Sequence, residues 1–152
     1  MNTTLQKRIA RAVLGAVCAL PFGAQAALGG NVASIGTDAA QMQAAAGSAI
    51  SQSAYTVYPL TLPSGTVVRE FVAANGNVFG VAWAGPTLPD LRTTLGASFD
   101  TYLASTATRR ATPLAVSSDT LVVFSGGQLR AFSGYAYLPQ AVPAGVNVNV
   151  IQ

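Results

Sequence analysis

Carboxylates are the side chains of this sequence with the clearest capacity for chemistry. The acidic residues are Asp38, Glu70, Asp90, Asp100 and Asp119. Two carboxylates on either side of a glycosidic bond can supply the acid and the base, or the acid and the nucleophile, of its hydrolysis. Glu70, the only glutamate, would be one member of such a pair, with Asp100 or Asp119 as the other. A solvated or salt-bridged Glu70 beside a strand arginine is the simpler interpretation, and we favour it.

The chain lacks most of the residue types that other kinds of catalysis and metal binding need. The chain has no histidine, and its only lysine and only cysteine, Lys7 and Cys18, precede residue 27. The serines of residues 27–152 therefore have no histidine or lysine to activate them, and zinc, copper and iron lack their preferred ligands. The acids are too scattered for a calcium site, and no glycine pair is followed by a phosphate-binding lysine. We expect no catalytic residues, no metal and no cofactor, and hence not an enzyme.

The first 26 residues have the pattern of a secretory signal peptide. Lys7, Arg8 and Arg11 precede an apolar run over residues 12–24, and Ala24-Gln25-Ala26 offers a small-x-small cleavage site. Cleavage between Ala26 and Ala27 would leave residues 27–152, in a periplasmic or extracellular protein. Cys18 is interpreted as a small apolar residue of the signal. No other stretch has the roughly 20 apolar residues that span a bilayer.

Removal of the signal also removes the basic character of the chain. The precursor has a formal net charge of +3. Residues 27–152 keep five arginines against five acidic residues, which gives a net charge of zero. No basic stripe remains to neutralise phosphates, so nucleic acid is not an expected partner.

Hydrophobic patterning predicts the helices and strands that would position these residues. Residues 27–53 are rich in Ala, Gly and Ser and predict a mobile arm, with a weak helix over residues 41–50. A single domain should cover residues 54–152. Strands are predicted at 55–62, 66–72 and 78–84, and a later hairpin should pair 120–124 with 129–138. A capping box from Thr87 to Asp90 predicts one helix that ends near Ser105, with Asp90 stabilised by the helix dipole. The expected fold is α+β: an antiparallel sheet of about five strands (β-β-β-α-β-β) with one helix packed on a face.

Alternation along the strands predicts which side chains lie together. Phe79, Val81 and Trp83 should share the core face of their strand, and Tyr135 and Tyr137 should share one face with Arg130 opposite. Tyrosines suit a half-wet site, whereas Trp83 is more simply a core residue. The candidate binding residues are Arg69, Glu70, Trp83, Arg92, Arg130, Tyr135 and Tyr137.

Several segments together resemble a known family. They are Ser64-Gly-Thr-Val-Val-Arg-Glu-Phe-Val, Asn75-Gly-Asn-Val-Phe-Gly-Val-Ala-Trp-Ala-Gly-Pro, Pro89-Asp-Leu-Arg and Ser125-Gly-Gly-Gln-Leu-Arg-Ala-Phe-Ser-Gly-Tyr-Ala-Tyr-Leu-Pro, preceded by Ala27-Leu-Gly-Gly. This order is similar to that of the exported bacterial domain-of-unknown-function family 2844. The resemblance implies export in a Gram-negative bacterium, and it implies no activity and no catalytic residues.

The sequence leaves three functions open. A non-enzymatic periplasmic or secreted module that binds another protein or an envelope component is the leading hypothesis. The alternatives are a small-molecule carrier with an apolar pocket bordered by Trp83 and the helix, and a carboxylate-dependent hydrolase of envelope glycans that uses Glu70.

Overall fold

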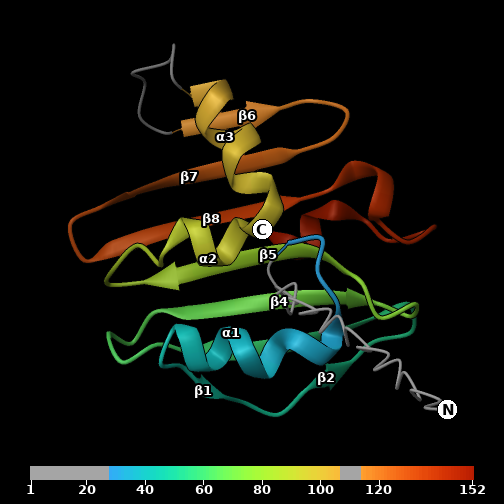
Figure 1. Ribbon diagram of the computed structural model, residues 1–152, viewed down its shortest axis with the longest axis horizontal. Coiled ribbons are helices and arrows are strands. Elements are labelled where there is room, and N and C mark those ends of the chain that lie inside the picture. The colour runs from blue at the N-terminus through green and yellow to red at the C-terminus, as the bar shows by residue number, and fades with distance from the viewer. Residues whose placement is uncertain (1–27, 107–113) are drawn as a thin grey trace, which may run out of the picture.

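One antiparallel sheet forms the centre of the molecule. The computed structural model describes residues 28–106 and 114–152. Within these ranges eight strands join a single sheet in the order β1-β3-β4-β5-β8-β7-β6, with β2 also paired to β3 (Figure 1). The strands are β1 (Ala45–Ala46), β2 (Ile50–Ser51), β3 (Tyr55–Thr61), β4 (Val67–Ala73), β5 (Val78–Gly85), β6 (Leu114–Ser117), β7 (Val122–Gln128) and β8 (Ala131–Tyr137).

The sheet consists of two meanders that meet at one pair of strands. Neighbours in sequence pair within β3-β4-β5 and within β6-β7-β8. The junction is the β5–β8 ladder, from Gly80 opposite Tyr137 to Gly85 opposite Phe132. At the outer edge of β3, Pro59 lies between the residues that pair with β1 and those that pair with β2. β3 is therefore not an edge strand, but Pro59, which has no N–H to donate, falls in the gap between its two outer partners.

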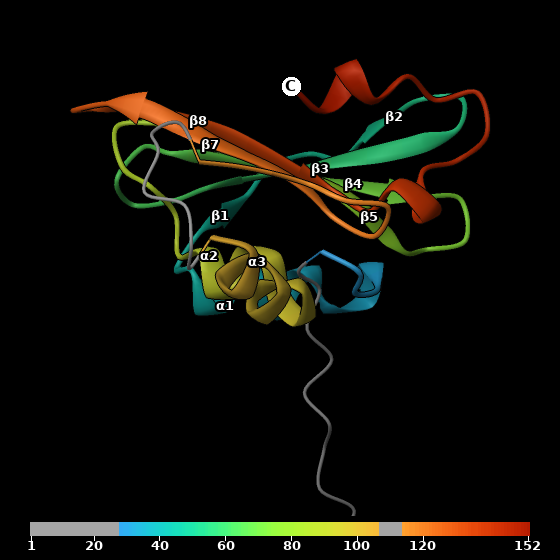
Figure 2. The same ribbon diagram turned by 90° about the horizontal axis from the view of Figure 1, so that it is seen from above.

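Different segments of the chain cover the two faces of the sheet (Figure 2). Helices α1 (Ile35–Gln41), α2 (Leu91–Leu95) and α3 (Phe99–Thr106) lie on one face, which we call the helix side. The C-terminal segment, with the 3-10 turns η3 (Pro139–Ala141) and η4 (Val148–Ile151), lies on the other, which we call the tail side. The prediction of about five strands with one helix is therefore wrong: the described residues hold eight strands and three short α-helices. No helix in these residues is long and apolar enough to cross a membrane.

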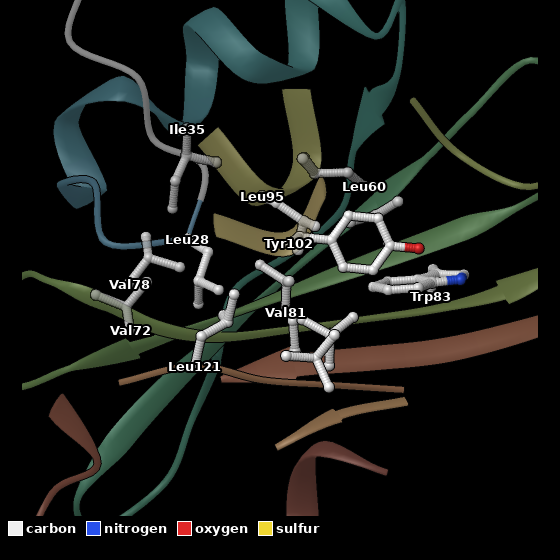
Figure 3. Close-up of a cluster of buried hydrophobic side chains, with 14 of the residues drawn as sticks. Leu28, Ile35, Leu60, Val72, Val78, Val81, Trp83, Leu95, Tyr102 and Leu121 are labelled. Carbon is white, nitrogen blue, oxygen red and sulfur yellow. The ribbon is translucent and has the colours of Figure 1, made fainter. Parts of the chain in front are cut away.

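Two hydrophobic clusters, one on each side, hold these layers together. The helix-side cluster includes Leu28, Ile35, Leu60, Val72, Val78, Val81, Trp83, Leu95, Tyr102 and Leu121 (Figure 3). The tail-side cluster joins Phe71, Phe79, Ala82 and Ile151 with the partly buried Tyr135 and Tyr137. The sheet is thus buried on both faces, which explains why β4 and β5 are apolar at nearly every position.

A bulge in β5 changes the face of Phe79. Val72 pairs with Val78 and Phe71 pairs with Gly80, so Phe79 is an extra residue in the ladder. Phe79 packs in the tail-side cluster, whereas Val81 and Trp83 pack on the helix side. The prediction that these three residues share a face is wrong, because simple alternation fails across a bulge.

The predicted single helix is two helices separated at Gly96. Gly96 has φ 50° and ψ −127°, a conformation that few residues other than glycine adopt, and a 3-10 turn connects α2 to α3. The N-cap is Asp90, whose carboxylate accepts a hydrogen bond from the Arg92 N–H at 3.1 Å. Thr87 does not cap the helix as predicted, because its hydroxyl and backbone bond Ser64 and Thr66 instead.

The ends of the domain also differ from expectation. The first helix lies at Ile35–Gln41 rather than at residues 41–50, and Leu28 and Ile35 from the segment predicted as an arm are buried in the core. The late hairpin turns at Leu129 and Arg130, so its first strand is longer than the predicted 120–124, and a further strand, β6, was not predicted. The C-terminal residues, for which no element was predicted, include the turn η4.

Candidate functional site

A row of side chains crosses the tail side in register. Arg69 on β4 pairs with Ala82 on β5, which pairs with Tyr135 on β8, which pairs with Phe124 on β7. The small alanine between the arginine and the tyrosine leaves space on the sheet surface. Phe124 and Tyr135 stack with ring centroids 5.6 Å apart and planes 21° from parallel. Tyr135 stacks in turn on Tyr137 at 6.4 Å.

This row opens into a pocket of about 240 Å³. Its lining is mostly apolar and consists of Arg69, Trp83, Ala84, Phe124, Ser133, Gly134, Tyr135 and Gln152. The Arg69 side chain is half-buried, and no acidic side chain of residues 28–106 or 114–152 lines the pocket. A planar guanidinium with five donors beside aromatic rings can bind a carboxylate or phosphate while a ring of the ligand stacks on the aromatics.

Glu70, next to Arg69 in β4, faces the opposite way. Its side chain is 2% exposed on the helix side, beneath the segment that carries α1. Burial, and to a smaller extent the charge of Asp38 on α1, together raise the pKa of Glu70 from 4.5 to about 8. Glu70 Oε2 has no hydrogen-bond partner in the described part of the chain. The expectation of a solvated or salt-bridged Glu70 is therefore wrong, and the carboxylate that acts on Glu70 is Asp38, not Asp100 or Asp119.

Trp83 is a core residue that also borders the pocket. It is 1% exposed and packs in the helix-side cluster, where Figure 3 shows its indole beside the Tyr102 ring. Gly134 lies directly beneath the indole on the neighbouring strand, since a Cβ built there would come 2.3 Å from Trp83 Cζ2. The absence of a side chain at Gly134 thus makes room for the largest side chain of the core.

The remaining candidates lie elsewhere. The Arg92 guanidinium sits over the Phe99 ring at 4.5 Å, on the helix side. Arg130 occupies the β7–β8 turn with φ 66° and borders a shallower hollow that includes Pro86 and Phe132. Of the predicted binding residues, Arg69, Trp83 and Tyr135 come together in one pocket and Tyr137 extends its aromatic stack, while Glu70, Arg92 and Arg130 are separate from it. The predicted cleavage site, Ala26 and Ala27, lies outside the described residues.

Sequence reasoning missed three residues of these sites. Phe124 could have been found, because the in-register pairing of β7 with β8 places it beside Tyr135. Gln152 lines the pocket only because the C-terminal segment folds back over the sheet. Asp38 is a lone acid in an alanine-rich segment, and no local pattern indicates that it is buried.

The fold and pocket define a class: a small antiparallel-sheet protein with helices on one face and an arginine-aromatic pocket on the other. Residues 24–151 match the family model described as "Protein of unknown function (DUF2844)", and the chain belongs to this family. The resemblance in the sequence is thus confirmed. No curated protein matches the chain, and no solved structure matches it.

Proposed function

We propose that this protein is an exported, non-enzymatic binding module whose pocket on the tail side holds an anionic unit of an envelope glycan. The observation that carries the proposal is the position of Arg69, half-buried in an apolar pocket beside the Phe124–Tyr135 stack, with no acidic side chain of the described residues in the lining. A guanidinium with no acidic side chain beside it in the pocket is available to a ligand, and the flat rings suit the apolar face of a sugar.

The size of the pocket limits what it can enclose. Pockets that bury whole drug-sized ligands range from about 300 to 1,000 Å³. A volume of about 240 Å³ is smaller. We infer that one ring or one terminal group of a larger molecule enters, with the rest of the molecule outside.

The two other functions have less support. A carrier with its pocket between Trp83 and the helix would need a cavity on the helix side, whereas the pocket that Trp83 borders is lined by Arg69 and Tyr135 of the tail side. A hydrolase that uses Glu70 would need this carboxylate to reach a substrate, and Glu70 is buried on the other face.

Calorimetric titration with matched sugars tests the proposal. The probes are short oligosaccharides that end in a uronic acid and their neutral counterparts, in low salt. Binding of the acidic form alone is expected, with a loss of about tenfold or more in affinity for Arg69→Ala, since a charged hydrogen bond contributes roughly 1.5–3 kcal/mol.

Arg130→Ala is the matched control, because it removes an exposed arginine outside this pocket. It should leave the affinity unchanged. Equal losses in the two variants, or equal binding of acidic and neutral sugars, would reject Arg69 as the recognition group.

The export part of the proposal rests on the signal-like residues 1–26. We propose cleavage between Ala26 and Ala27 and a location in the periplasm or outside the cell of a Gram-negative bacterium. An intact mass of the protein purified from its native periplasm or medium tests this, with a chain that begins at Ala27 as the expected result.

A further inference from the structure

A second hollow continues the pocket along the tail side of the sheet. The pocket beside Arg69 has a volume of about 240 Å³, and the hollow beside Arg130 has a volume of about 430 Å³. Ala84 and Ser133, which pair across the β5–β8 ladder, line both of them. The two hollows therefore meet at this pair of residues, and together they form what we call the tail-side groove.

Small side chains form the floor of the tail-side groove where the hollows meet. Ser133 on β8 lies between Ala84 on β5 and Gly126 on β7. Ala84 and Ser133 are exposed, and so is Ala131, the next residue of β8 on the same face. This strip follows directly on the row of side chains that contains Tyr135. An extended ligand can therefore lie against the sheet here without meeting a large side chain.

The C-terminal segment closes the sheet in the other direction. Ile151 is completely buried and packs on Gly80 of β5, which lies beyond Ala82 on the side away from Ala84. In Figure 2 this segment lies over the part of the sheet away from the β7–β8 turn. A ligand that has one unit in the pocket and continues along the sheet therefore extends toward this turn.

Arg130 lies in that turn, at the end of the tail-side groove. It is exposed, and no acidic side chain of the described residues lines either hollow. Its φ of 66° falls in the left-handed region, which glycine and asparagine adopt at lower cost than arginine. The conformation of the turn therefore gives no reason for an arginine at this position, whereas an anionic ligand in the groove would.

The register of the strands gives the distance between the two arginines. Arg69 lies in the same row as Tyr135, two strands away, and Arg130 precedes Tyr135 by five residues. At about 3.4 Å per residue along a strand and about 4.8 Å between strands, the two arginine Cα atoms lie about 20 Å apart. One carboxylate cannot contact both guanidinium groups over this distance. A ligand that uses both must carry at least two anionic groups.

We propose that the tail-side groove binds a linear polyanionic glycan, with one acidic sugar in the pocket at Arg69 and another acidic sugar of the same chain at Arg130. The inference rests on the proposed function and adds to it the direction of the glycan and the repetition of its acidic group. Residues 27–152 have a net charge of zero, so the domain does not attract polyanions through its overall charge. Binding should depend on these two positions.

Calorimetric titration with acidic oligosaccharides of increasing length tests this inference. The probes are oligomers of galacturonic acid from two to eight units, in low salt. The shortest should bind through Arg69 alone, like the sugars with a single acid described above. Oligomers long enough to reach Arg130 should bind about three- to fivefold more tightly to the wild type than to a variant without this arginine, because an exposed ion pair contributes modestly. The comparison with the variant removes the gain that longer oligomers obtain by offering more units to the pocket.

Arg130→Gly is the variant for this comparison. Glycine adopts a φ of 66° without strain, so the variant should retain or exceed the Tm of the wild type. Its affinity should equal that of the wild type for the shortest oligomer and fall below it for the long ones. Arg92→Ala is the control, because it removes an exposed arginine on the helix side with the same change in net charge. It should bind like the wild type at every length.

The outcomes separate this inference from the proposed function. Equal effects of Arg130→Gly and Arg92→Ala would overturn the inference, because overall charge would then explain them. Binding that depends on Arg69 but is the same in Arg130→Gly and the wild type at every length would also overturn it, and would leave the proposed function intact. An absence of binding to every acidic oligomer would overturn both.

Discussion

Ile151 anchors the C-terminal segment and provides the sharpest test of how the tail side packs. Its side chain is completely buried. A Cβ added to Gly80 would come 2.8 Å from Ile151 Cδ1, but 3.4 and 3.5 Å from its Cγ1 and Cγ2. The closest contact that a side chain at residue 80 would make is therefore with a single methyl group.

The substitutions Gly80→Ala and Ile151→Val are expected to compensate each other. Gly80→Ala alone overpacks this site and should cost about 1–3 kcal/mol. Ile151→Val alone removes the Cδ1 methyl and should cost about 0.5–1.5 kcal/mol. In the double variant the alanine methyl occupies the vacated space, so the combined cost should fall below the sum by at least about 1 kcal/mol.

Urea denaturation at 25 °C, followed by circular dichroism, measures the free energies of unfolding. The matched control pairs Gly80→Ala with Ile35→Val in the helix-side cluster, where the two costs should add within about 0.5 kcal/mol. Additive costs for Gly80→Ala and Ile151→Val as well would refute the close packing of Ile151 on β5.

Three further substitutions test local features. Gly134→Ala would place a methyl group 2.3 Å from Trp83 Cζ2, so we expect a loss of at least about 3 kcal/mol and altered fluorescence of the single tryptophan. Asp90→Ala removes the N-cap of α2 and should cost about 1 kcal/mol at pH 7 in urea denaturation. Hydrogen bonds, above all that from the Thr93 hydroxyl, lower the pKa of Asp90 below its ordinary value of 3.8. The stabilisation of the fold by Asp90 is therefore fully present above pH 3.8 and is lost as the pH falls through the lowered pKa. Thr66→Val deprives the Thr87 N–H of the buried hydroxyl that accepts its bond at 3.1 Å, and a cost of about 1–3 kcal/mol is expected in the same assay.

The strands of the first meander were predictable because their signals are local. Alternation of β-branched residues and the turn residues at Gly65 and Asn75–Gly76 placed all three strands to within about a residue of β3, β4 and β5. The bulge at Phe79 was not predictable, because nothing in residues 78–84 distinguishes an extra residue from a regular strand. The break at Gly96 had one signal, the glycine itself in the middle of the predicted helix.

The candidate site, like the fold, could be predicted from the sequence only in part. Arg69 and Tyr135 were both candidates, but only the pairing of β5 with β8 brings them into one row, and that pairing joins the two halves of the domain. The burial of Glu70 depends on α1, which an alanine-rich segment with little apolar surface does not predict. Contacts between segments far apart in sequence therefore account for most of what the sequence did not predict.

The junction of the two meanders has a consequence for how the chain can misassemble. Each meander pairs neighbours in sequence, whereas the β5–β8 ladder must bring residues 80–85 to residues 132–137 across a long connection. Closing that connection costs the most chain entropy, so the ladder is expected to form last. Until it forms, β5 and β8 are open edges with complementary partners in any other copy of the chain. Two chains that exchange their second meanders would satisfy every strand, and a domain-swapped dimer is the expected by-product of refolding at high concentration.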